Sequence, residues 1–191
     1  RPRDWSSDVC SSDLVGASGT STGGANTAIG YQSLNSNTTA SNNTAVGYQA
    51  GYSNVTGTGL TAIGYYSGRL STGDRNTFVG RYSASNTTAS DNTAIGDSAL
   101  YANTSGAYNT VLGANALASN TTGSQNTAVG YQAGYSNTTG TKLTSIGRIS
   151  GYSNTTGGSN IYVGDSAGYT NSTGNNNTAM GDSALYLNTA S

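Results

Sequence analysis

The sequence predicts an all-β fold: a parallel β-solenoid (β-roll) of ten coils, each 16–17 residues long. A five-residue phrase, first met as Asn-Thr-Ala-Ile-Gly at residues 26–30, recurs along the chain and closes each time on glycine. The closing glycines are Gly30, Gly47, Gly64, Gly80, Gly96, Gly113, Gly130, Gly147, Gly164 and Gly181. A short, nearly constant period of this kind is typical of one coil of chain stacked on the next.

Each phrase is expected to form a strand. The residue before the closing glycine is always aliphatic or Met: Ile29, Val46, Ile63, Val79, Ile95, Leu112, Val129, Ile146, Val163 and Met180. Side chains alternate between the two faces of a strand, so Thr27 shares the face of Ile29 and Ala28 takes the other. We expect the aliphatic column to be the core and the mostly small Ala column to lie outside.

The remainder of each repeat predicts a second short strand and two turns. The second strand is expected three residues after each glycine, beginning at Ala or Ser and often reaching a Tyr two residues later. Segments such as 120–123 and 137–140 predict turns, because Asn and Gly tolerate left-handed backbone angles. The density of Gly, Asn, Thr and Ser disfavours helix, and recurring Asn predicts hydrogen-bonded ladders along the stack.

Each coil can bury only a small amount of apolar surface, which favours association of several chains. One or two sizeable core side chains per coil contribute about 1.5–3 kcal/mol each, which is marginal against the entropy of ordering the chain. We therefore expect an oligomer, with the Ala column and parts of the Leu/Tyr column at the seam. Residues 43–60 nearly recur at 126–143, and such duplication of a five-coil block suits a length-tunable rod better than a single catalytic site.

The first fourteen residues differ from the rest. They hold the only Pro, the only Trp and the only Cys of the chain: Pro2, Trp5 and Cys10. Residues 4–14 resemble a sequencing adapter translated in one frame. We expect residues 1–14 to be a non-native, disordered segment and residues 15–191 to be a β-solenoid repeat domain truncated at both ends.

The repeated Thr-Ala-Ile/Val-Gly phrase, followed by Ala/Ser-rich residues, resembles the head repeats of trimeric autotransporter adhesins (YadA-like heads). It also resembles the repeats of phage tail-fibre and related surface-fibre proteins that end in an intramolecular chaperone domain. The resemblance covers residues 26–191. It implies a side-by-side homotrimer, an extracellular place on a bacterial surface or virion, and a role in attachment to a host surface protein or glycan and in virulence. The alternative within it is a tail-fibre shaft.

The position after each closing glycine supplies the candidate ligand contacts, which are Tyr31, Tyr48, Tyr65, Arg81, Tyr131 and Arg148. Their aromatic faces could contact glycans. The favoured interpretation is a surface ladder in which Arg81 pairs with Asp97 and Arg148 with Asp165, one coil on.

Several other functions are not expected. The repeats contain no His, Cys or Glu, so we expect no enzyme, no catalytic residue, no cofactor and no metal site. A net charge of −1 gives no reason to expect nucleic acid, and no apolar run is long enough to cross a membrane. Ice binding by the Thr column is the weaker alternative, because that column shares its face with the expected core.

Overall fold

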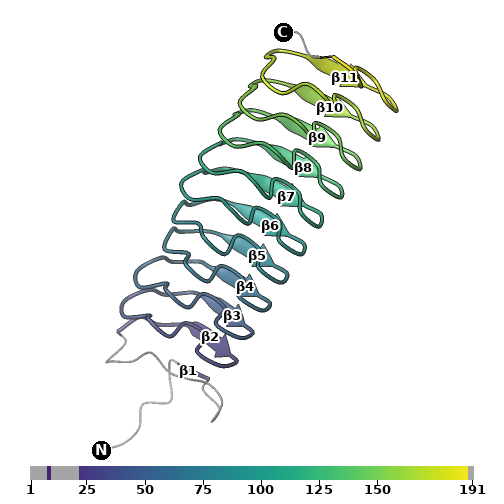
Figure 1. Ribbon diagram of the computed structural model, residues 1–191. Helices are drawn as coiled ribbons and strands as arrows, with labels where there is room; N and C mark the ends of the chain where they lie inside the picture. The colour runs from purple at the N-terminus through teal and green to yellow at the C-terminus, as the bar shows by residue number, and fades with distance from the viewer. Residues whose placement is uncertain (1–7, 10–21, 189–191) are drawn as a thin grey trace, which may run out of the picture.

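A computed structural model describes residues 8–9 and 22–188, which stack into a rod (Figure 1). Each coil contributes one short strand to a single parallel sheet, in which the strands follow one another in sequence order. The strands are β1 Asp8–Val9, β2 Asn26–Ile29, β3 Thr44–Val46, β4 Thr61–Ile63, β5 Thr77–Val79, β6 Thr93–Ile95, β7 Thr110–Leu112, β8 Thr127–Val129, β9 Thr144–Ile146, β10 Ile161–Val163 and β11 Thr178–Met180. The predicted parallel solenoid is confirmed, and no helix occurs among the described residues.

The strands pair in register, so equivalent residues of successive repeats lie side by side. Thr44 pairs with Thr61, and Ala45 pairs with Ala62. The register also holds across a 16-residue repeat, where Ala62 pairs with Phe78. Each sequence column is therefore a physical column along the rod.

The face of the strands that is buried is the opposite of the predicted one. Thr and aliphatic side chains do share a face, but that face points outward: Ile29 is 49% exposed, Leu112 48% and Met180 70%. Ala45 and Ala62, in contrast, are fully buried. The prediction of a core made by Ile29, Val46, Ile63, Val79, Ile95, Leu112, Val129, Ile146, Val163 and Met180 is therefore wrong, since each of these is half-buried or exposed.

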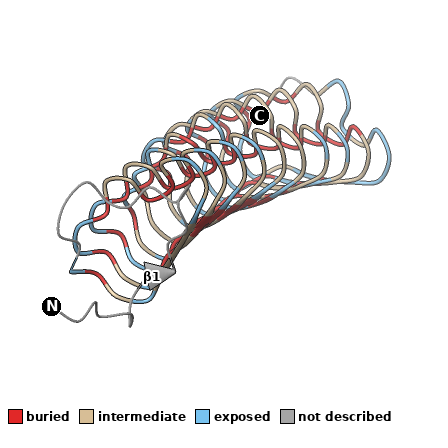
Figure 2. Ribbon diagram, turned by 90° about the horizontal axis from the view of Figure 1, so that it is seen from below, coloured by how far each residue is buried: buried red, intermediate tan, exposed pale blue. Residues whose placement is uncertain are grey.

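The reason for the reversal is the narrow interior of the coil. The Ala column faces a wall built from the turn side of the same coils, where Ser or Ala is followed by Leu, Gly or, at residue 84, Ala. Protein interiors are filled to crystal-like density, and the room that remains after the turn-side Leu residues have packed suits Ala better than Ile. Figure 2 shows the buried segments at the same places in successive coils.

Glycines on the turn side make room for the larger core side chains. A Cβ on Gly51 would lie 3.0 Å from the Cδ2 atoms of both Leu34 and Leu60. A Cβ on Gly68 would lie 2.8 Å from Cδ2 of Phe78. Gly thus stands where a neighbouring coil supplies a bulky side chain, so the interior stays evenly filled along the rod.

The predicted second strand is also wrong. After each closing glycine the chain runs through consecutive turns. In the third coil, for example, Tyr66 and Gly68 both have positive φ, 56° and 53°. Left-handed residues at every second position break the extended conformation that a strand needs. The turns still stack, since the amide of Tyr66 donates to the carbonyl of Tyr48 one coil back at 2.9 Å.

The predicted Asn ladders are confirmed. The side-chain amide of Asn120 donates to Oδ1 of Asn103, that of Asn137 to Asn120, and that of Asn154 to Asn137, each at 2.8 Å. In a second ladder, the backbone amide of Asn109 donates to Oδ1 of Asn92 at 3.0 Å. These ladders satisfy buried polar groups between coils, which would otherwise be costly to bury.

At the N-terminal end of the rod, β1 pairs in parallel with the start of β2. This pairing involves only two residues of the segment expected to be non-native and disordered, and that expectation for residues 1–14 stays a prediction. An open sheet edge presents unpaired backbone groups that an extended dipeptide can satisfy. The remainder of that adapter-like segment lies outside the described residues.

Candidate functional site

The rod has two distinct long surfaces. The strand face consists of the outward Thr and aliphatic side chains of β2–β11. The turn face consists of the residues that follow each closing glycine. Nine of the ten positions in the Thr column are Thr, the exception being Ile161, whereas the turn face changes from coil to coil.

The strand face carries a continuous apolar stripe. In β4, for instance, Thr61 is half-buried and Ile63 is exposed, and the same pair recurs in β6 as Thr93 and Ile95. In-register pairing aligns these residues in straight columns. An exposed contiguous apolar surface of this kind marks an interaction site more often than a solvated face.

On the turn face, the residues predicted as ligand contacts form two aromatic steps and two ion pairs. Tyr31 stacks on Tyr48 with ring centroids 5.1 Å apart, and Tyr48 stacks on Tyr65 at 5.2 Å. All three rings are exposed. They form one short ladder at the N-terminal part of the rod.

The predicted ion pairs are confirmed. Arg81 Nε lies 2.7 Å from an oxygen of Asp97, and Arg148 Nε lies 2.7 Å from an oxygen of Asp165. Tyr131, the remaining residue of the predicted set, is exposed. Its neighbours in the column are Ala114 and Arg148, so the set does not converge on one point but is spread along the rod.

Hydrogen bonds between exposed side chains of the rod shift several pKa values further from neutral pH. A hydrogen bond with Tyr66, together with partial loss of hydration next to the neighbouring rings, raises the pKa of Tyr65 to about 12. The hydrogen bond with Asp97 raises the pKa of Arg81 above its ordinary value. The hydrogen bond with Arg75 lowers the pKa of Asp91. Arg and Asp side chains are charged at physiological pH without such partners, and these shifts widen the pH range over which the pairs stay charged.

A second tyrosine column lies five residues after the closing glycines. Tyr135, Tyr152, Tyr169 and Tyr186 stack in order, with centroids 5.3, 5.2 and 5.0 Å apart and planes within 11° of parallel. We refer to this column as the tyrosine ladder. None of these residues was predicted to contact ligand, although their fixed distance from the closing glycine is the sequence signal for a ladder.

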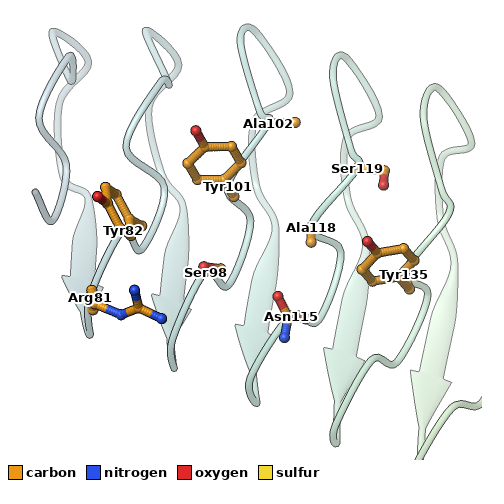
Figure 3. Close-up of a pocket in the computed structure, with 9 residues that line it drawn as sticks. All are labelled: Arg81, Tyr82, Ser98, Tyr101, Ala102, Asn115, Ala118, Ser119 and Tyr135. Carbon is orange, nitrogen blue, oxygen red and sulfur yellow. The ribbon is translucent and has the colours of Figure 1, made fainter.

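The tyrosine ladder is interrupted at Ala118, where the turn face is hollowed. An open depression of about 590 Å³ lies there. Tyr101 and Tyr135 stand on either side of Ala118 (Figure 3). Its other lining residues are Arg81, Tyr82, Ser98, Ala102, Asn115 and Ser119. The volume falls within the range of sites that hold small ligands.

Within residues 8–9 and 22–188, no group of three or more His, Cys, Asp or Glu side chains could hold a metal ion. The same residues include no helix that is both long and apolar enough to span a membrane. No family model, no curated protein and no solved structure matches the chain.

Proposed function

We propose that the rod is a structural and attachment segment of an extracellular fibre or adhesin head, in which identical chains lie side by side as a homotrimer. The observation that carries this proposal is the apolar stripe along the whole strand face. It extends over the strands of ten coils, or roughly 48 Å at the spacing of parallel strands.

A second copy of the chain is the partner that best fits the stripe. Its own stripe has the same rise from coil to coil, so aliphatic side chains of two rods meet at every coil when the rods are parallel. Each Å² of apolar surface removed from water contributes about 25 cal/mol, and the many small contributions add along the rod. The Thr side chains beside the stripe can donate and accept hydrogen bonds across such a seam.

The seam therefore differs from the one expected from the sequence. Ala45, Ala62 and their equivalents are enclosed within their own coil and cannot contact a neighbouring chain. The Thr and aliphatic columns take that role in the proposal. Three chains, rather than two, follow from the resemblance to trimeric fibres. In this role the rod performs no catalysis, needs no cofactor and contacts neither nucleic acid nor membrane; a tail-fibre shaft would use the same seam.

Sedimentation velocity on the purified chain tests the seam. The wild-type chain is expected to sediment as a trimer, and the double variant Ile63→Asp/Ile146→Asp as a folded monomer, because two buried charges at the seam are costly. The control is Tyr31→Asp/Tyr131→Asp, which places equal charge on exposed turn-face positions and should remain trimeric. A folded wild-type monomer would overturn the proposal.

Ice binding is a second candidate, because the Thr column is not buried as the sequence suggested. Thr and aliphatic side chains stand outward in regular columns, and such an array can order water. Thermal hysteresis of the purified chain tests this candidate. Hysteresis from a monomer that Ile63→Asp/Ile146→Asp abolishes would favour ice binding, whereas a trimer without hysteresis would exclude it.

A further inference from the structure

We propose that the depression at Ala118 binds one ring of a neutral glycan, a pyranose unit that takes the place of the missing rung of the tyrosine ladder. The biological meaning of this site rests on the proposed role in attachment. Its chemistry does not depend on self-association, because the depression lies on the turn face and the proposed seam lies on the strand face.

The size of the gap matches one ring. Tyr101 and Tyr135 occupy equivalent positions two coils apart, so they are separated by roughly 10 Å along the rod, at about 4.8 Å per coil. Ala118 extends only a methyl group into the space between them. A ring centred there would lie about 5 Å from each tyrosine, within the range of about 4.5–7 Å at which stacked rings interact.

The two tyrosine walls are supported from behind. Tyr135 stacks on Tyr152 with planes 7° apart, and Tyr101 meets Tyr82 edge to face at 6.1 Å. No aromatic contact spans Ala118 in the part of the chain that the structure describes. The walls are thus held in place before a ligand arrives, which reduces the entropy lost on binding.

The rim of the depression offers unused hydrogen-bonding groups. The side chains of Ser98, Asn115 and Ser119 line it. Their backbone amides donate to carbonyls of neighbouring coils, but no side-chain hydrogen bond of these three residues occurs within residues 22–188. An amide and two hydroxyls supply both donors and acceptors. A pyranose presents C–H groups on its faces and hydroxyls at its edge, so its faces suit the tyrosines and its edge suits this rim.

The charge of the site favours an uncharged ligand. Arg81 is the one cation that lines the depression, and it forms two hydrogen bonds to the carboxylate of Asp97, at 2.7 and 3.0 Å. An anionic sugar, or a nucleotide with its phosphate, would have to compete with Asp97 for that guanidinium. A neutral hexose needs no such exchange.

The gap has no equivalent elsewhere in the described ladder positions. The column is also interrupted between Tyr52 and Tyr101, where Arg69 and Ser85 stand in place of tyrosines. The Arg69 guanidinium fills its position, since it lies over the rings of Tyr52 and of the nearby Tyr66, at 5.6 and 5.1 Å. Ser85, next to it, has a tyrosine on one side only. We therefore expect one binding site per chain.

The test is isothermal titration of the full chain with neutral hexose oligomers, namely maltohexaose, cellohexaose and mannohexaose, and with a sulfated oligosaccharide for comparison. The wild-type chain is expected to bind at least one neutral oligomer, with one site per chain, and to bind the sulfated one more weakly. Ala118→Tyr completes the ladder with the residue found at equivalent positions. It should fold normally and weaken binding by about tenfold or more, which corresponds to about 1.4 kcal/mol.

Two further variants make the test specific. Tyr135→Ala removes a wall and should weaken binding similarly, whereas Tyr169→Ala, two coils away, should leave it unchanged. Absence of binding to all three neutral oligomers, equal affinity in Ala118→Tyr, or a preference for the sulfated oligosaccharide would each overturn the proposal. The Ile63→Asp/Ile146→Asp variant should keep its sugar binding, so failure of the seam and failure of the site are distinguishable.

Discussion

The strand face and the turn face of this rod are built from the same repeats but differ in how they vary. On the strand face, the same pair of residues, Thr and an aliphatic, returns in almost every coil. On the turn face, rings, ion pairs and small residues replace one another at equivalent positions. A uniform face suits contact between identical rods, because any coil can meet any other. A face that varies can form a site at one particular coil, as at Ala118.

The largest effect is expected where the two faces join. Gly113 has φ +142°, and a Cβ there would meet the carbonyl of Gly130, with the carbonyl carbon only 2.7 Å away. Gly113→Ala should therefore lower the free energy of unfolding by about 4 kcal/mol or more. The control is Gly181→Ala, which has a similar φ but nothing within 4 Å and should lose only the cost of backbone strain, about 1–3 kcal/mol. Urea denaturation compares the two, and equal losses would contradict the role of close stacking.

The next largest effect is the difference in stability between a substitution in the interior and one on the strand face. Leu143 is buried and Leu112 is 48% exposed, so Leu143→Ala should cost about 2–5 kcal/mol. Leu112→Ala should change the stability of a single rod by less than about 1 kcal/mol, while weakening association of the chains. Thermal unfolding at low and high protein concentration distinguishes these outcomes. A larger loss for Leu112→Ala in the monomer would restore the core assignment made from the sequence.

A third effect depends on pH and concerns a side chain that links the strand to the turn side. Burial raises the pKa of Tyr162 to about 12, although a hydrogen bond from Asn171 opposes the shift. The unfolded chain loses this proton near pH 10 while the folded chain keeps it, so stability is lost as pH rises from about 10 to about 12, by roughly 2–3 kcal/mol.

The pKa of Tyr65 is also raised, so Tyr65 makes its own contribution to the loss of stability at high pH. Tyr162→Phe is therefore the matched control, because it removes only the contribution of Tyr162. Urea unfolding of both proteins between pH 9 and pH 12 should show a steeper loss for the wild-type chain. Parallel curves would mean that Tyr162 does not keep its proton when folded.

The smallest effect lies on the turn face alone. Arg148 and Asp165 are ion-paired at 2.7 Å, but their side chains are 59% and 37% exposed. Arg148→Ala should change the free energy of unfolding by less than about 1 kcal/mol, because exposed pairs are screened by solvent. Denaturation at low and high salt measures the change, and a loss of several kcal/mol would show that such pairs hold the coils together.

Much of the architecture was predictable because it depends on spacing. The period of the closing glycines predicts the number of coils, and the recurrence of Asn predicts ladders such as Asn103–Asn120–Asn137. The pairing of Arg81 with Asp97 followed from their offset of one coil. The second strand could not be predicted correctly, because left-handed backbone at residues such as Tyr66 has no distinctive side-chain signature. The site at Ala118 was also missed, since a missing ring becomes a gap only when its neighbours are known to stack.

By itself, the sequence determined the period, the strand columns and the alternation of Thr, Ala and aliphatic residues, because these depend only on the order of residues along the chain. Only the tertiary structure decided which face of the strand is inside. Alternation is symmetric between the two faces, and hydrophobicity pointed to Ile29 and Leu112. The volume left by the opposite wall of the coil, with Leu34, Leu100 and Leu117 already packed in it, admits Ala45 and Ala62 and leaves the larger aliphatic side chains outside.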